Sequence, residues 1–284
     1  MSAPPMFRLV DERRVTVARD AGAVHRVLDA DPVGCCMVAA RVAEHGIDPT
    51  AIGGELWTRR GADESLCYAG ANLIPLRGTR LDLHAFADKA LGSARRCSSL
   101  VGRAELVLPL WRRIERTWGP ARDVREHQPL MAMASAPCCP VDAGVRRVRI
   151  DELDAYLVAA IDMFIGEVGI DPRLGDGGRG YRRRVAGLIA ARRAWARFER
   201  GEVIFKAEVG SQSPAVGQIQ GVWVHPDYRG HGLGTAGTAA VVAAVVRSGR
   251  IASLYVNNFN TVARAAYARV GFAQVGTFAT VLLD

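Results

Sequence analysis

The sequence predicts an α/β fold with a mixed sheet (α+β), divided into two successive domains. From residue 146 onward, hydrophobic residues change between helical and strand spacing in the order α-α-β-β-β-α-β-α-β. Just before this point, residues 134–144 contain two prolines and a glycine and follow neither period, which is typical of a linker. We therefore expect an N-terminal domain over residues 1–137, a linker over 138–145 and a C-terminal domain over 146–284.

The first half contains its own helical and strand patterns. A helix is expected over residues 21–30, where Asp31-Pro32 ends it, and a second over residues 33–44, which Gly46 ends. After these we expect, in order, strands over 54–59 and 65–76, a helix over 83–95, a strand over 98–101, a helix over 105–118 and a strand over 128–134.

The second half has a sharper pattern. Asp151 opens a helix whose hydrophobic residues, from Tyr156 to Ile165, recur at helical spacing, and a loop rich in glycine and charge follows. That loop covers residues 169–180. The remaining expected elements are a helix over 181–195, strands over 196–200, 203–209 and 216–225, a helix over 235–247, a strand over 253–257, a helix over 261–270 and a strand over 272–283.

Composition narrows the class of protein. The chain has 284 residues, 49% of them hydrophobic, which is enough to form buried cores in two domains. Its longest apolar run, residues 235–246, is too short to cross a bilayer, and residues 1–14 carry charges where an export signal needs an apolar segment. The six cysteines show no CxxC spacing, so we expect reduced thiols and no metal site. We expect a soluble cytoplasmic protein without a membrane partner.

The formal net charge of +8 raises the question of a nucleic-acid partner. Lys89 and Lys206 are the only lysines, so 35 of the 37 basic residues are arginine. These arginines are dispersed along the chain, and no aromatic residues alternate with them in a stripe. The pattern argues against nucleic acid. A generally positive field would nevertheless favour anionic ligands, including the phosphates of a nucleotide cofactor.

A glycine-rich segment joins a strand to a helix in the second half. The segment runs from Val222 through Pro226 to Thr235, and Gly230, Gly232 and Gly234 alternate within its loop. Because glycine has no Cβ, such a loop lets several backbone N–H groups converge on one point. The helix that follows adds the positive end of its dipole. Together these features indicate a site for a pyrophosphate.

Residues 232–237 also fit the GxGxxG pattern of dinucleotide-binding folds. That fold requires an acidic residue about twenty positions further on, to hold the ribose hydroxyls. Residues 229–283 contain no Asp or Glu, and the loop lies too near the C-terminus for the remaining strands and crossovers. We therefore reject the dinucleotide interpretation.

The segment resembles the acetyl-CoA signature of the GNAT superfamily of N-acetyltransferases. The family pattern, Gln/Arg-x-x-Gly-x-Gly/Ala, is matched by Arg229, Gly232 and Gly234, and the lead-in strand by Val222, Val224 and Pro226. A second family segment consists of a strand, an Asn, a helix bearing a Tyr, and Gly-Phe. It is matched by residues 254–257, Asn260, Tyr267 and Gly271-Phe272. The two motifs follow in the family's order and imply an acyl-CoA N-acyltransferase fold for the second half.

The resemblance implies acetyl-CoA as the cosubstrate and a role for each matching position. Tyr267 would be the general acid that protonates the leaving thiolate, and Asn260 would contact the cofactor near its thiol end. Backbone groups of Val222, Trp223 and Val224 would pair with the pantetheine arm. The pyrophosphate would be bound by the N–H groups of Arg229, Gly230, His231, Gly232, Leu233, Gly234 and Thr235. The alternative for Tyr267 is an ordinary aromatic residue between helix and sheet.

The general base is less clear from the sequence. Many family members carry a carboxylate on the strand before the glycine loop, but this strand carries Gln218 and Gln220. Glu167 is our first choice, because the first helix and the loop after it usually line the acceptor site. Glu208 and His225 are the alternatives; Glu208 could equally be a solvated strand residue, and His225 could simply orient the turn.

The first half resembles a degenerate copy of the same fold, which gives a tandem GNAT-like arrangement. Residues 98–105 occupy the expected place of the cofactor loop, with one glycine and with Glu105 beside the phosphate position. We expect this half not to bind CoA productively, and to shape the acceptor cleft or mediate dimer contacts. An unrelated α+β domain is the alternative.

The resemblance implies an enzyme that moves the acetyl group of acetyl-CoA to a primary amine of a small molecule, peptide or protein by direct attack. The alternative is a sensor or scaffold that binds acyl-CoA without turnover, and the presence of Tyr267 and Asn260 favours the enzyme. The expected partner is the amine-bearing acceptor, with a homodimer left open.

Overall fold

A computed structural model of the chain describes residues 14–59 and 64–284. By its internal contacts the chain forms two compact units. Unit 1 consists of residues 1–130 and 274–284, and unit 2 of residues 131–273. Within the described parts of the chain, no helix is both long enough and apolar enough to span a membrane.

Unit 1 contains a sheet with the strand order β1-β2-β3-β4-β5-β12. Its elements are β1 (Val15–Val17), α2 (Ala21–Ala30), α3 (Cys36–His45), β2 (Gly54–Arg59), β3 (Leu66–Gly70), β4 (Asn72–Arg77), α4 (Arg80–Leu91), β5 (Ser99–Arg103), α5 (Ala104–Trp118) and β12 (Ala273–Leu282). Strands β4 and β5 are parallel, whereas the pairs β1–β2, β2–β3, β3–β4 and β5–β12 are antiparallel. Strand β6 (Asp123–Met133) leaves unit 1 and ends in unit 2.

Unit 2 repeats this order of elements. Its strands follow the order β11-β10-β9-β8-β7, and only β10 and β11 form a parallel pair. Its elements are β7 (Arg146–Arg147), α6 (Leu153–Val168), α7 (Arg179–Ala190), β8 (Ala194–Glu199), β9 (Glu202–Gln212), β10 (Val216–Val224), α8 (Leu233–Arg247), β11 (Ile251–Tyr255) and α9 (Thr261–Val270). Short 3₁₀ turns precede α6 and follow β10, at Ile150–Glu152 and Pro226–Tyr228.

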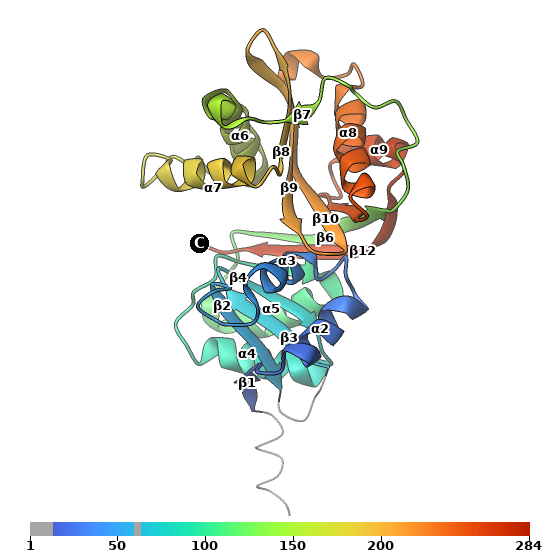
Figure 1. The fold of residues 1–284 in the computed structure, drawn as a ribbon. Helices are drawn as coiled ribbons and strands as arrows, with labels where there is room; N and C mark the ends of the chain where they lie inside the picture. The colour runs from blue at the N-terminus through green and yellow to red at the C-terminus, as the bar shows by residue number, and fades with distance from the viewer. Residues whose placement is uncertain (1–13, 60–63) are drawn as a thin grey trace, which may run out of the picture. The chain divides into compact units, whose positions relative to one another are not determined.

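Helices cover both faces of the unit 2 sheet (Figure 1). On one face, α6 and α7 form a core with β8 and β9, in which Tyr156 and Val185 are buried. On the other face, α8 and α9 pack on β9, β10 and β11 around Phe205. Successive side chains of a strand point to opposite faces, so the side chains along β9 and β10 alternate between these two faces. We call the first of these the α6/α7 face and the second the α8/α9 face.

The expected α/β fold with a mixed sheet is confirmed, including the helices at 21–30 and 261–270. Two expectations about single elements were wrong. The apolar run over 65–76 is a hairpin of β3 and β4, because the chain turns at Ala71. The helix expected to continue to Trp195 ends at Ala190, and Trp195 pairs with Ala207 in the sheet.

The division of the chain differs from the expected linker at 138–145. The compact units separate at Leu130, inside β6, and the last strand, β12, pairs antiparallel with β5 of unit 1. The predicted linker residues therefore lie within unit 2, where Asp142 bonds to the backbone of Ala236. A strand's own residues show that it is a strand, but they do not show which neighbour it will pair with.

Candidate functional site

The parallel strands β10 and β11 separate after three residues. Their register covers Val216 to Gln218 on β10, and no pairing with β11 continues beyond Gln218. Strand β10 stays paired with β9 as far as Val224 on its other edge. The last part of β10 therefore has one free edge, which leads directly toward the turn before α8.

The hydrogen bond of His225, just after β10, shows toward which edge the backbone groups of the last residues of β10 point. His225 N donates to Ile204 O of β9 at 3.0 Å. Because backbone groups of alternate residues face opposite edges of a strand, Trp223 also faces β9, whereas Val222 and Val224 face the free edge. Of the three residues expected to pair with pantetheine, Val222 and Val224 thus present their backbone groups to the opening.

The glycine-rich loop makes a sharp turn into α8. Gly230 and Gly232 both have φ of +80°, in the left-handed region where residues with a Cβ are strained. Gly232 is the N-cap of α8, and a Cβ at either glycine would meet no atom within 4 Å. The space in front of this loop is therefore open.

Several N–H groups of the loop have no acceptor among the described residues. Arg229 N donates to Pro226 O and Thr235 N to Gly232 O, so the two ends of the expected pyrophosphate-binding segment are bonded internally. Between them, the N–H groups from Gly230 to Gly234 make no hydrogen bond with the described part of the chain. They lie at the positive end of the 15-residue helix α8.

A cavity of about 680 Å³ opens beside this helix N-terminus. Arg197 and Arg269 contribute positive charge to its lining, whereas Asp142 and Glu199 contribute negative charge. Arg197 is bonded to Asp142 at 2.7 Å, whereas Arg269 of α9 forms no ion pair with any of the described residues. Its lining consists of Cys139, Pro140, Asp142, Arg197, Glu199, Ile204, Tyr228, His231, Gly232, Leu233, Thr235, Ala236 and Arg269.

Two further glycines allow α8 to pack closely on the sheet. A Cβ at Gly234 would lie 3.4 Å from Val224 Cγ2, and a Cβ at Gly237 would lie 2.7 Å from the Phe205 ring. Gly237 thus completes the GxGxxG pattern because the helix approaches β9 there, and not because a dinucleotide requires it.

Arg229 and Asn260 are held by local bonds. Arg229 Nε donates to Val224 O at 3.0 Å, so this side chain closes the end of β10. Asn260 is the N-cap of α9, and its Oδ1 accepts from Ala263 N at 3.1 Å. The side chain of Asn260 is exposed, which leaves its amide nitrogen available to a ligand.

Tyr267 lies on α9 with its side chain 8% exposed. Its ring contacts Phe272 edge to face, with centroids 6.1 Å apart, and its hydroxyl makes no hydrogen bond to a described residue. Burial raises the pKa of Tyr267, and the charge of Glu167 raises it further. The phenol therefore stays protonated at neutral pH.

Glu167 lies at the end of α6 and is exposed. Although it belongs to a different helix from Tyr267, its carboxylate acts on the pKa of that phenol, and also on the pKa of Tyr181. The structure thus brings the two expected catalytic side chains within electrostatic reach of each other.

The two alternative bases are engaged elsewhere. Glu208 is 1% exposed on β9, and its Oε1 accepts from Lys206 Nζ at 2.9 Å. Burial would raise the pKa of Glu208, but the charges of Lys206 and Arg184 bring it below its ordinary value. His225 Nδ1 accepts from Asp227 N at 3.3 Å and caps the 3₁₀ turn, as the turn-orienting interpretation expects.

The charged side chains of the loop after α6 form local bonds. Arg173 forms a bidentate pair with Asp171 at 2.7–3.1 Å, and Asp176 accepts from the backbone of Gly178 and Gly180. Asp171, Arg173 and Asp176 therefore all have partners within this part of the chain.

Comparison with known proteins agrees with this geometry. A model of the acetyltransferase (GNAT) family matches residues 169–272, which include the loop, α8 and α9. A second model, for a domain of unknown function (DUF4081), matches residues 54–156. Residues 169–272 thus match the GNAT acetyltransferase family.

A mycothiol acetyltransferase from Cellulomonas flavigena is 31% identical over 231 residues, covering 76% of this chain and 61% of the relative. The match thus spans less than two thirds of that relative's length. A tandem GNAT protein from the clavulanic acid biosynthesis pathway has a TM-score of 0.50 at 14% identity, covering 95% of this chain and 98% of its own. A Drosophila protein has a TM-score of 0.64 at 13% identity, with coverages of 95% and 98%. These structures support a tandem GNAT fold.

The unit 1 equivalent of the cofactor loop is not at residues 98–105, where the sequence placed it. Those residues form β5 and the start of α5. The helix between the parallel strands β4 and β5 is α4, so the loop that corresponds to Val224–Leu233 is Gly78-Thr79. Only two residues join strand and helix there, which is too short for a row of converging N–H groups.

The N-terminus of α4 already carries a carboxylate. Asp82 is 2% exposed, and its Oδ2 accepts from both the N–H and the hydroxyl of Thr79 at 2.7 Å. Its Oδ1 is bonded to Arg59. An acidic side chain thus occupies the place where a helix N-terminus would accept a phosphate.

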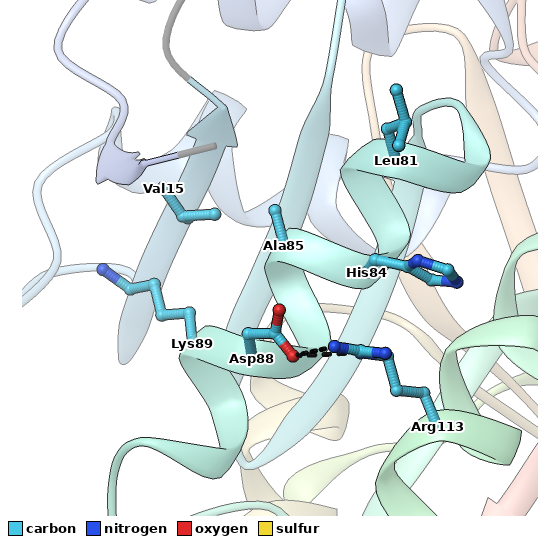
Figure 2. Close-up of a pocket in the computed structure, with 7 residues that line it drawn as sticks. All are labelled: Val15, Leu81, His84, Ala85, Asp88, Lys89 and Arg113. Carbon is cyan, nitrogen blue, oxygen red and sulfur yellow. Dashed lines mark hydrogen bonds and ion pairs between the residues drawn. The ribbon is translucent and has the colours of Figure 1, made fainter. Parts of the chain in front are cut away.

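A cavity of about 440 Å³ in unit 1 lies between α4 and α5 (Figure 2). His84 and Lys89 line it from α4, and Asp88 is bonded to Arg113 of α5 at 2.6 and 2.9 Å. It has no glycine-rich loop. No group of three His, Cys, Asp or Glu suited to a metal ion occurs in the described ranges 14–59 and 64–284.

Proposed function

We propose that this protein transfers the acetyl group of acetyl-CoA to a primary amine of a small molecule, peptide or protein. The observation that carries this is the free edge of β10 leading to the unbonded N–H groups of residues 230–234 at the start of α8. An extended arm that ends in a pyrophosphate fits both features at once. The match of residues 169–272 to the GNAT family supports the same assignment.

The cosubstrate would lie with its pyrophosphate at the loop and its pantetheine along β10. N–H groups from Gly230 to Gly234 would bind the phosphates, and Arg269 would add a positive charge. Backbone groups of Val222 and the N–H of Val224 would pair with the pantetheine amides as an added strand would, since Val224 O already accepts from Arg229 Nε. The thioester would then lie at the point where β10 and β11 separate.

Acetyl transfer needs a neutral amine, a polarised carbonyl and a protonated leaving group. The amine nitrogen attacks the thioester carbon, the C–N bond forms and the C–S bond breaks. We assign Glu167 the removal of the amine proton, directly or through water, and Tyr267 the protonation of the thiolate. Burial keeps the Tyr267 phenol protonated at neutral pH, so a proton is present when the thiolate leaves.

A thiol-release assay with acetyl-CoA and a library of primary amines tests the proposal. The library should include the acceptor of the mycothiol acetyltransferase that the chain resembles. We expect at least one amine to release CoA thiol in wild type and Tyr267→Phe to lose most of this rate while still binding acetyl-CoA. Binding without release for any amine would favour the acyl-CoA sensor, and no binding would refute the assignment.

A further inference from the structure

A fully buried ion pair lies on the α6/α7 face of the unit 2 sheet. Lys206 is 0% and Glu208 1% exposed, and both are on β9 with Lys206 Nζ 2.9 Å from Glu208 Oε1. The ammonium also lies 5.3 Å from the ring centroid of Tyr156. Arg184 of α7 approaches Glu208 Oε2 at 3.5 Å. Two cations thus surround one carboxylate, and the cluster carries a net positive charge.

The cluster lies directly beside an irregularity in β10. Register between β9 and β10 shifts between Gln220 and Trp223, and Gly221 within this bulge has φ of +58°. A Cβ at Gly221 would lie 3.1 Å from Lys206 Nζ and 3.0 Å from Met163 Cε. The ammonium therefore packs against the backbone at the position where Gly221 has no side chain.

This bulge immediately precedes Val222, the first residue whose backbone faces the free edge of β10. Burying charges is expensive, and an apolar pair of similar volume would stabilise the strand at least as well. Stability therefore does not explain why Lys206 and Glu208 are charged, and their position beside the bulge has to be explained in another way.

We propose that Lys206 is a positioning residue for acyl transfer. Its ammonium, oriented by Glu208, fixes the bulge at Gly221 and places a positive charge behind the backbone that holds the thioester carbonyl. Negative charge that develops on this carbonyl oxygen during amine attack is then stabilised by a group that needs no reorganisation. The inference rests on the proposed function, because it takes the thioester to lie at the free edge of β10.

Infrared difference spectroscopy of the whole chain with acetyl-CoA labelled with ¹³C at the thioester carbonyl tests this without knowledge of the acceptor. In wild type we expect the carbonyl stretch to lie below that of free acetyl-CoA. The double variant Lys206→Met, Glu208→Gln removes both charges and keeps the side-chain sizes. In this variant we expect the carbonyl stretch to move back toward the value of free acetyl-CoA, while the dissociation constant of acetyl-CoA is unchanged. A purely structural role would not shift the stretch in a folded variant.

The matched control is Arg103→Met, Asp31→Asn, which removes a bidentate ion pair of unit 1 with bonds of 2.8 Å and should leave the stretch unchanged. If the first double variant does not fold, Lys206→Gln, Glu208→Gln replaces it, since its two amides can bond to each other. With an amine identified, the transfer rate of either folded variant should fall about tenfold or more.

The outcomes separate this inference from the proposed function. Failure of wild type to bind acetyl-CoA refutes both. Binding and transfer in wild type, with the same carbonyl stretch and rate in the folded Lys206 variants, overturns this inference alone. Failure of both pair variants to fold also counts against it, because the pair would then be required for the fold itself.

Discussion

Replacement of Gly232 by Ala gives the most direct test of the N–H groups at the start of α8. Gly232 has φ of +80°, and a Cβ there would meet no atom within 4 Å. The cost to the fold is therefore backbone strain alone, about 1–2 kcal/mol for a left-handed residue. Reduced entropy of the unfolded chain offsets about 0.4–1 kcal/mol of this. We expect a net loss of about 1 kcal/mol, or a fall in Tm of about 2–4 °C.

The cost to cofactor binding should be larger. If the loop relaxes toward negative φ, the N–H groups of Gly232 and Leu233 turn away from the phosphate position. A hydrogen bond to a charged group contributes about 1.5–3 kcal/mol, so loss of one such bond weakens acetyl-CoA binding about 10- to 100-fold. Isothermal titration with acetyl-CoA measures this change in dissociation constant.

Gly249 provides the matched control, because it follows the other end of α8 with φ of +78° and open space around a Cβ. Gly249→Ala should lower Tm as Gly232→Ala does and leave the dissociation constant unchanged. Equal affinities of the two variants would refute the assignment of the phosphate site to this loop, provided that wild type binds.

Three further changes test other parts of the structure. Tyr267→Phe should lower the single-turnover transfer rate about 10²- to 10⁴-fold without weakening acetyl-CoA binding, and an unchanged rate would exclude it as the acid. Gly237→Ala should destabilise the chain by about 1–3 kcal/mol in urea unfolding, since its Cβ would lie 2.7 Å from the Phe205 ring; a neutral effect would mean that α8 moves freely. Burial raises the pKa of Asp82, but its bonds to Arg59 and Thr79 outweigh this and hold the pKa below the ordinary value of 3.8. The ionised carboxylate of Asp82 therefore stabilises the fold above pH 3.8, and this stabilisation is lost as the pH falls further. Asp82→Asn should therefore flatten the acid side of the stability curve measured by thermal unfolding, and an unchanged curve would contradict the ion pair.

The sequence allowed the C-terminal site to be predicted because its chemistry is local. A loop with glycine at alternate positions, followed by a helix, dictates converging N–H groups through φ preferences and the helix dipole alone. The structure agrees at Gly230 and Gly232, and restricts the unbonded N–H groups to residues 230–234 because Arg229 and Thr235 are bonded internally. The roles of Tyr267 and Glu167 remain proposals.

Residues that act through neighbours on other strands could not be predicted in this way. Lys206 looks in the sequence like one of two ordinary lysines, yet it is completely buried. Its burial depends on Glu208 two residues further along β9, on Tyr156 of α6 and on the missing side chain of Gly221. The one sequence signal was alternation: Lys206 and Glu208 interrupt an apolar strand at period two, and so share one face.

By itself the sequence determined the α/β class through its periodicity and the GNAT-like second half through its motifs, and it located the glycine-rich loop that we propose binds phosphate. Only the tertiary structure decided that Gly78-Thr79, and not residues 98–105, is the corresponding loop of unit 1, and that Asp82 fills its helix N-terminus. It alone also assigned β12 to unit 1 through pairing with β5. Strand partners and buried ion pairs depend on contacts between segments far apart in the chain, and no local pattern encodes them.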